Sequence, residues 1–88
     1  MTPYAVYLKN SAQRELDRLP PASHEAVLKQ LKALRFEARP RNAAKLQGRP
    51  EYKIRVGNLR IIYGVDDAKR EVMVYMIDDR KQVYRRLR

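Results

Sequence analysis

Three cations occupy a short segment in which apolar and charged residues alternate with a period of two. Lys53 and Arg55 alternate with apolar residues over 52–56, and Arg60 stands near the start of a second alternating run. The Gly-Asn pair between the runs is typical of a type II′ β-hairpin. With that turn, Arg55 lies directly opposite Arg60 and Lys53 shares their face of the sheet. Such a cation cluster suggests binding of an anionic ligand.

Two interpretations of this cluster stay open. Directly opposed like charges destabilise a strand pair, so Arg55 opposite Arg60 favours a ligand over a purely structural role. The alternative is a solvated outer face, where the repulsion costs only about a few tenths of a kcal/mol. A turn misplaced by one residue would separate the cluster, because a register shift moves side chains to the other face.

The distribution of charge along the chain also indicates an anionic partner. The chain has 88 residues with 20 Lys and Arg against 10 Asp and Glu, giving a formal net charge of +10. Residues 39–60 carry seven basic side chains and one acid, and residues 80–88 carry five and none, so the remainder is close to neutral. A charge of this size favours a polyanion, of which nucleic acid is the commonest.

Missing residue types exclude several kinds of active site. Without cysteine the chain has no disulfide, thiolate zinc site or cysteine nucleophile. A single histidine, His24, excludes Ser-His-Asp triads and histidine-based metal clusters, and we expect it to be a solvated residue near a helix start. No apolar run approaches the roughly 20 residues of a membrane span, and no secretory pattern is visible. We expect a cytoplasmic protein that needs no metal, cofactor or membrane.

Periodicity predicts the elements that position these residues. A strand over 4–9 precedes a helix that starts at 10–11 and ends at a Pro-Pro pair. A second helix starts within 21–23 and ends before Pro40, which suggests an antiparallel helical hairpin.

The second half of the chain is predicted to be mostly strand. Residues 39–50 are basic and interrupted by Pro and Gly, so we expect an irregular segment there. The expected strands are 52–56, 59–65 and 71–77. The last of these places three apolar residues on one face: Val72, Val74 and Met76. With a charged tail over 78–88, the order is β-α-α-β-β-β, a single α+β domain over 1–88 with a mainly antiparallel sheet and two N-terminal helices on one face.

Besides the element order, three stretches of the sequence are distinctive. They are SAQRELDRLP near the N-terminus, then KLQGRPEYKIRVGNLRIIYGVDD, then VMVYMIDDRKQVYRR. The most specific part is YKIRVGNLRIIY. Together they resemble the RelE/ParE superfamily of bacterial toxins from toxin–antitoxin pairs, and the resemblance covers most of the chain. It implies two N-terminal helices on one face of the sheet and a basic concave surface on the other.

Within that superfamily, RelE-like members cleave mRNA in the ribosomal A site, whereas ParE-like members poison DNA gyrase and lack the basic catalytic set. The resemblance to RelE-like members implies five catalytic residues in this chain: Lys53, Arg55, Arg60, Arg80 and Tyr84. Arg55 stands where relatives often have a second lysine. Many relatives carry Gly-His before the late arginine, but this chain has two aspartates, whose carboxylates could form an ion pair with Arg80.

Roles for these residues follow from metal-free RNA cleavage, in which the 2′-hydroxyl attacks the adjacent phosphate. Lys53 is the expected base, since neighbouring cations favour a neutral amine. Arg55 and Arg60 would hold the phosphate. Arg80 would stabilise or protonate the leaving oxygen, and Tyr84 would stack on a base or orient the 2′-hydroxyl. The remaining expected RNA-binding residues are Lys45, Arg49, Lys81, Arg85 and Arg86.

The resemblance also implies partners: a cognate acidic antitoxin, the ribosome with its rRNA, and mRNA, with operator DNA bound only through the antitoxin. Two other functions stay open. One is a ParE-like gyrase inhibitor, against which the retained basic set argues. The other is a nucleic-acid-binding module without catalysis, which the two aspartates before Arg80 leave possible.

Overall fold

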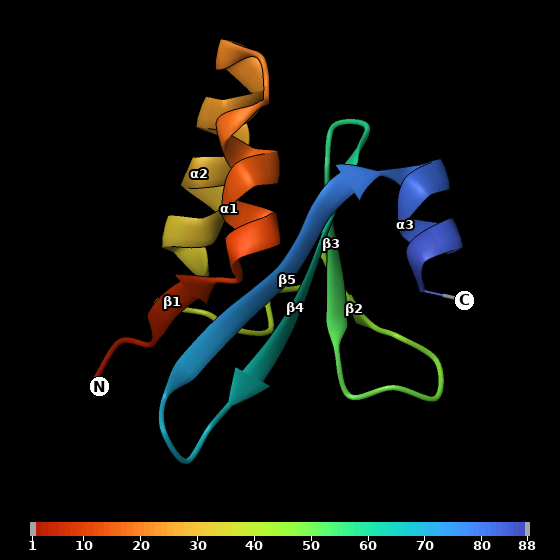
Figure 1. Cartoon of the computed structure of the whole chain (residues 1–88). Coiled ribbons are helices and arrows are strands. Elements are labelled where there is room, and N and C mark those ends of the chain that lie inside the picture. Colours follow the sequence, from red (N-terminus) through yellow and green to blue (C-terminus); the bar gives the residue numbers. More distant parts are fainter. Residues whose placement is uncertain (1, 88) are drawn as a thin grey trace.

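The computed structural model describes residues 2–87, and in this part of the chain three helices accompany one five-stranded sheet (Figure 1). In chain order the elements are β1 (Ala5–Leu8), α1 (Asn10–Asp17), α2 (Pro21–Leu34), β2 (Ala43–Lys45), β3 (Tyr52–Val56), β4 (Leu59–Asp66), β5 (Glu71–Asp79) and α3 (Arg80–Arg86). The sheet order is β1-β5-β4-β3-β2, antiparallel except that β1 and β5 are parallel. This is the predicted α+β class.

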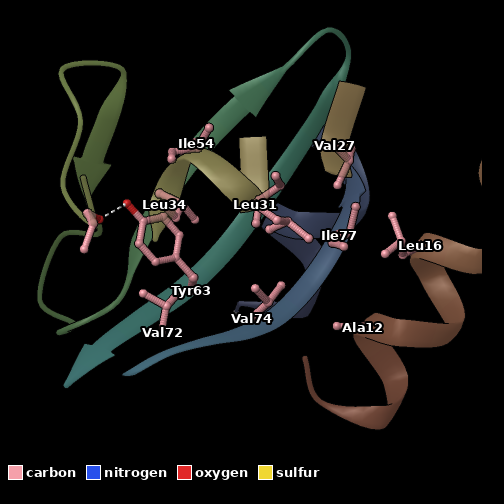
Figure 2. Packing of buried hydrophobic residues seen from close by; sticks show 12 residues of the cluster. Ala12, Leu16, Val27, Leu31, Leu34, Ile54, Tyr63, Val72, Val74 and Ile77 are labelled. Atoms are coloured by element: carbon pink, nitrogen blue, oxygen red, sulfur yellow. Dashed lines mark hydrogen bonds between the residues drawn. The ribbon is translucent and has the colours of Figure 1, made fainter. Parts of the chain in front are cut away.

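Helices α1 and α2 cover one face of the sheet, here called the inner face. Ala12 and Leu16 lie four residues apart on α1, and Val27, Leu31 and Leu34 repeat at three and four on α2, so each helix presents one apolar stripe. A proline occupies the first turn of α2, where its missing N–H costs no hydrogen bond. Figure 2 shows both stripes packed against the strands. Burying each large apolar side chain contributes roughly 1.5–3 kcal/mol.

The predicted β3–β4 hairpin is confirmed. Gly57 has a φ of +59°, while Asn58 is outside the left-handed region, as a type II′ turn requires. The register pairs Lys53 with Ile62, Ile54 with Ile61, Arg55 with Arg60 and Val56 with Leu59. Both isoleucines of the second pair are fully buried on the inner face, so the alternating cations point to the opposite face, here called the outer face.

Strand β5 contains a bulge that the alternation pattern did not reveal. Its register with β4 shifts by one residue between Met76 and Val74, which leaves Tyr75 as the extra residue. Ile77 is therefore buried on the inner face with Val72 and Val74, whereas Met76 is only half-buried. The prediction that Met76 shares a face with Val72 and Val74 was wrong.

The predicted charged tail was also wrong, because Arg80–Arg86 forms helix α3. The side chain of Asp79 caps this helix by accepting a hydrogen bond from the backbone N–H of Gln82 at 2.9 Å. Helix α3 contacts β4 and β5 and buries Val83. Ile62, which points to the outer face, is buried as well. Part of the outer face is thus covered by α3.

One short strand was missed in the segment expected to be irregular. Ala43–Lys45 pairs antiparallel with β3 and extends the sheet by one edge strand. Three residues are too few for an alternation pattern to identify a strand. No helix within residues 2–87 is both long and apolar enough to cross a membrane.

Candidate active site

The hairpin places Lys53, Arg55 and Arg60 together on the outer face, as predicted; these three residues are called the cationic face below. Arg60 lies directly between Arg55 on β3 and Asp78 on β5. Lys53 is two residues from Arg55 on the same strand. Among the described residues, none of the three side chains takes part in an ion pair with an acid. The cationic face therefore retains its charge for a ligand.

The guanidinium groups of the cationic face make only single contacts with nearby carbonyls. Arg55 Nε donates to the carbonyl oxygen of Gly57 at 3.2 Å, and Arg60 Nη1 donates to that of Leu59 at 3.4 Å. Each guanidinium has five N–H donors. Most donors of both arginines thus remain available to phosphate oxygens, which guanidinium binds in pairs.

A groove of about 400 Å³ opens where the hairpin meets the start of α3. The groove is lined by seven residues: Arg55, Asn58, Arg60, Asp79, Arg80, Lys81 and Gln82. It brings the late arginine of the predicted catalytic set to the arginine pair of the hairpin, although the two regions are separate in sequence. Four of the lining residues are cationic and two are amides, and the one acid, Asp79, accepts a hydrogen bond from the backbone N–H of Gln82, so the chemistry of the groove suits an anionic ligand.

Tyr84 and Lys53 do not line this groove but lie beside groups that do. The guanidinium carbon of Arg80 is 5.8 Å from the centre of the Tyr84 ring, one helical turn along α3. Tyr84 is 55% exposed, so one surface of its ring can stack on a base. Lys53 lies two residues before Arg55 on the same face of β3, outside the groove.

The expected ion pair between Arg80 and the preceding aspartates is absent among the described residues. Asp79 caps α3 instead, and Asp78 Oδ2 accepts from Arg86 Nη1 at 3.1 Å. The pairing that the sequence left possible does not form, because both carboxylates are engaged by other groups. Arg80 is therefore free to serve the groove.

The five expected RNA-binding residues divide into two groups. Lys45, Lys81 and Arg85 are exposed and have no ion-pair partner within the described chain. Arg49 pairs with Glu51 at 2.8 Å and donates to the carbonyl oxygen of Leu87. Arg86 pairs with Glu15 and Asp78. Arg49 and Arg86 thus make internal contacts that their sequence positions did not indicate.

A second charged cluster lies at the end of the sheet remote from the hairpin turn; it consists of Arg39, Asp67, Tyr4 and Tyr52 and is called the Arg39 cluster. Arg39 Nη1 and Nη2 donate to the two carboxylate oxygens of Asp67 at 3.0 and 2.8 Å, and Arg39 Nε donates to the Tyr52 hydroxyl. Hydrogen bonds from Arg39 and then Tyr4 lower the pKa of Asp67 from 3.8 to about 2. The same carboxylate raises the pKa of Arg39 and of Tyr4.

Sequence reasoning placed His24 correctly near a helix start, since its N–H donates to the carbonyl oxygen of Pro20 in the first turn of α2. Helix α2 covers the inner face, so this imidazole does not reach the groove. Asn58 was missed as a groove residue, because only the meeting of the hairpin with α3 reveals its place. Within residues 2–87, no group of three His, Cys, Asp or Glu side chains could hold a metal ion.

Comparison with known proteins gives consistent matches. A family model described as the ParE toxin of a type II toxin–antitoxin system, parDE, matches residues 6–84. Toxin RelG of Mycobacterium tuberculosis is 30% identical over 91 residues, covering 96% of this chain and 99% of the relative.

Solved structures agree with these sequence matches. A toxin in the RelBE2 toxin–antitoxin complex of M. tuberculosis superposes with a TM-score of 0.78 at 30% identity, covering 89% of this chain and 99% of that one. The isolated E. coli RelE toxin gives 0.78 at 28% identity, with 96% and 94% covered. A chain of the RelE–RelB complex of Pyrococcus horikoshii OT3 gives 0.80 at 28% identity, with 91% and 97% covered.

Proposed function

The chain belongs to the RelE/ParE superfamily as a RelE-like type II toxin, and from that premise we propose that it is a ribosome-dependent endoribonuclease that cleaves mRNA in the A site. One observation carries the proposal. Arg55 and Arg60 of the cationic face meet Arg80 at one groove, and no acid forms an ion pair with any of these three arginines in the described chain. A fold that keeps these charges unpaired, against their mutual repulsion, is suited to a phosphate in its transition state.

The proposed reaction uses side chains of the toxin and the 2′-hydroxyl of the RNA, and the ribosome positions the substrate. The 2′-oxygen attacks the adjacent phosphorus while its proton passes to Nζ of Lys53, and the bond from phosphorus to the 5′-oxygen breaks. Arg55 and Arg60 bind the nonbridging oxygens, where negative charge develops. Arg80 stabilises the leaving 5′-oxygen, which takes up a proton from water. The products are a 2′,3′-cyclic phosphate and a 5′-hydroxyl, and Tyr84 stacks on a base beside the scissile bond.

The proposed partners follow from the same premise. The similar chains from M. tuberculosis and P. horikoshii were solved as complexes with antitoxins, and we propose that a cognate acidic antitoxin neutralises this chain. The net charge of +10 favours such a partner electrostatically. Operator DNA would be bound only through the antitoxin, whereas the ribosome and mRNA would be bound by the toxin itself.

Replacement of the base tests the proposal. We expect Lys53→Ala to lower the cleavage rate on programmed ribosomes at least about a hundredfold, because general base catalysis contributes that much or more. The matched control is Lys29→Ala, which removes an exposed lysine from α2 on the other side of the sheet. Both variants should keep the parental thermal stability and bind RNA. Equal cleavage by Lys53→Ala and the parent would disprove the assignment of the base. For the parent, we expect cleavage only on ribosomes and none of naked RNA.

A second candidate is inhibition of DNA gyrase, because the family model that matches the chain describes a ParE toxin. Inducible expression followed by mapping of mRNA 5′ ends and an assay of DNA supercoiling separates the candidates. Cuts phased with codons support the endoribonuclease. Double-strand breaks or lost supercoiling support the gyrase inhibitor. If neither codon-phased cuts nor a change in the DNA is seen, a nucleic-acid-binding module without catalysis remains.

A further inference from the structure

Glu15 on α1 connects the inner helices to strand β5. Its Oε1 accepts a hydrogen bond from the backbone N–H of Ile77 at 3.0 Å. Strand β1 pairs with β5 only as far as Val74, so Ile77 lies beyond the end of that pairing. A backbone N–H in such a position needs another acceptor, and the carboxylate of Glu15 provides it. Glu15 is thereby fixed at the edge of β5, beside the start of α3.

The second carboxylate oxygen of Glu15 accepts from Nη1 of Arg86, near the end of α3. The same Nη1 donates to Asp78 Oδ2 at 3.1 Å, so Arg86 joins residues of α1 and β5 to α3. The side chains of Arg86, Glu15 and Asp78 are only 33%, 21% and 30% exposed. Partial burial makes this network stronger than an isolated surface ion pair, and Arg86 also offsets the repulsion between its two carboxylate partners. These three residues are called the Arg86 latch.

Apart from the latch, helix α3 is held by the Asp79 cap at its start, by the hydrogen bond from Arg49 to the carbonyl oxygen of Leu87 at its end, and by one buried side chain. It has seven residues, of which only Val83 is buried. A single buried side chain holds a helix near a surface but leaves it free to turn about its own axis. Arg86 lies three residues after Val83 and adds a second fixed point. At about 100° per residue, Arg80 and Tyr84 lie roughly 120° to 160° around the helix from Arg86. Rotation of α3 would therefore carry both away from the groove.

We propose that the Arg86 latch sets the orientation of α3, so that Arg80 and Tyr84 act on the scissile phosphate and its neighbouring base. Arg86, Glu15 and Asp78 are then positioning residues, and Arg86 does not itself bind RNA. The inference rests on the proposed endoribonuclease function. It changes the role of Arg86, which the sequence analysis had placed among the RNA-binding residues. It also gives a role to Glu15 on α1, which covers the inner face.

The decisive variant is Glu15→Gln, because it distinguishes an Arg86 that binds RNA from an Arg86 that positions α3. The two roles predict different changes in the cleavage rate. The amide oxygen of glutamine still accepts from the Ile77 N–H, but the charge that binds Arg86 is gone. The variant is also more positive than the parent, so if Arg86 merely attracts RNA, its release should leave cleavage unchanged or improve it. The latch instead predicts a fall of about tenfold in the cleavage rate at saturating toxin, since a small misplacement of reacting groups costs at least that much.

Hydrogen exchange measures the latch independently of cleavage. The N–H of Leu87 donates to the carbonyl oxygen of Val83 at 3.0 Å and reports on the end of α3. We expect its exchange to accelerate about fivefold in Glu15→Gln and in Arg86→Gln. The double variant should be no worse than Arg86→Gln alone, because Glu15→Gln breaks a contact that Arg86→Gln has already removed.

Arg85→Gln is the matched control, since it removes the same charge from the next residue of α3, which has no ion-pair partner within the described chain. It should raise the toxin concentration needed for half-maximal cleavage without accelerating exchange at Leu87. Identical behaviour of the two arginine variants, or parental cleavage and exchange in Glu15→Gln, would overturn the latch. If the parent itself cleaves no mRNA, the proposed function fails, and exchange at Leu87 still decides whether Arg86 holds α3.

Discussion

The two charged clusters of this protein use the same residue type in opposite ways. In the Arg39 cluster, the guanidinium of Arg39 donates three hydrogen bonds to Asp67 and Tyr52, each with a donor–acceptor distance of 3.0 Å or less. On the cationic face, Arg55 lies directly opposite Arg60 with no acid paired to either in the described residues. An arginine whose donors are satisfied internally stabilises the fold, whereas one left unsatisfied is available to a ligand. The difference separates structural from functional charge in a chain whose net charge is +10.

The largest expected contrast comes from neutralising one arginine in each cluster. Arg60→Gln should lower mRNA cleavage on ribosomes by about a hundredfold or more, because a donor to the transition-state phosphate is lost. Its melting temperature should stay the same or rise slightly, since the repulsion with Arg55 is relieved. Arg39→Gln should do the reverse: it keeps the parental cleavage rate and melts at a lower temperature.

Cleavage assays and thermal melts on the same two preparations check this pair of outcomes. Loss of stability without loss of cleavage in Arg60→Gln would contradict the assignment of the cationic face. Loss of cleavage in a fully folded Arg39→Gln would show that the remote cluster also serves the reaction.

The second contrast concerns a hydroxyl beside the Arg39 cluster. Tyr63 is fully buried and stacks on Tyr52 with ring centres 5.7 Å apart. Its hydroxyl donates to the carbonyl oxygen of Ala38 at 2.8 Å, the dashed line in Figure 2. Tyr63→Phe leaves that carbonyl without its partner, so we expect a loss of about 1 kcal/mol of unfolding free energy. A loss of this size lowers the melting temperature by about 4–8 °C in a domain of this length.

Chemical denaturation and a thermal melt measure the effect, with cleavage per folded molecule as the control. Ile61→Val, a conservative change in the same core, distinguishes the hydrogen bond from a general sensitivity of the core to substitution. A Tyr63→Phe variant as stable as the parent would show that water replaces the lost donor.

The fold was predictable where local signals set it. The turn glycine and the alternation around it determine the register of β3 and β4, and hence the cationic face. Two other features, the bulge in β5 and helix α3, could not be predicted from local patterns. The bulge at Tyr75 carries no Gly or Pro to reveal it, and α3 has one buried residue in seven, so its helical period is too weak to recognise.

The candidate site shows the same limit. Lys53, Arg55 and Arg60 were found because one hairpin holds them. The groove needed the packing of α3 on the sheet, which no short-range pattern specifies. The pairing of Arg86 with Glu15 joins residues 71 positions apart. Before the structure, Arg86 could not be distinguished from its neighbour Arg85, since both are arginines in the same charged run.

The smallest expected effect is the pH dependence of the Arg39 cluster. The pKa of Asp67 is lowered from 3.8 to about 2, chiefly by hydrogen bonds from Arg39. A carboxyl whose pKa is lower in the folded state stabilises the fold above its unfolded pKa, and this contribution is lost as the pH falls toward the folded value. The difference in melting temperature between the parent and Asp67→Asn should therefore be constant above about pH 5 and shrink between about pH 4 and pH 2. The deficit in melting temperature of Arg39→Gln relative to the parent should shrink over the same window, because protonation of Asp67 removes from the parent the pairing that the variant already lacks. A difference that stays constant down to pH 2 would mean that Asp67 contributes through packing and not through its charge, and the contrast with the cationic face would then rest on Arg39 and Tyr52 alone.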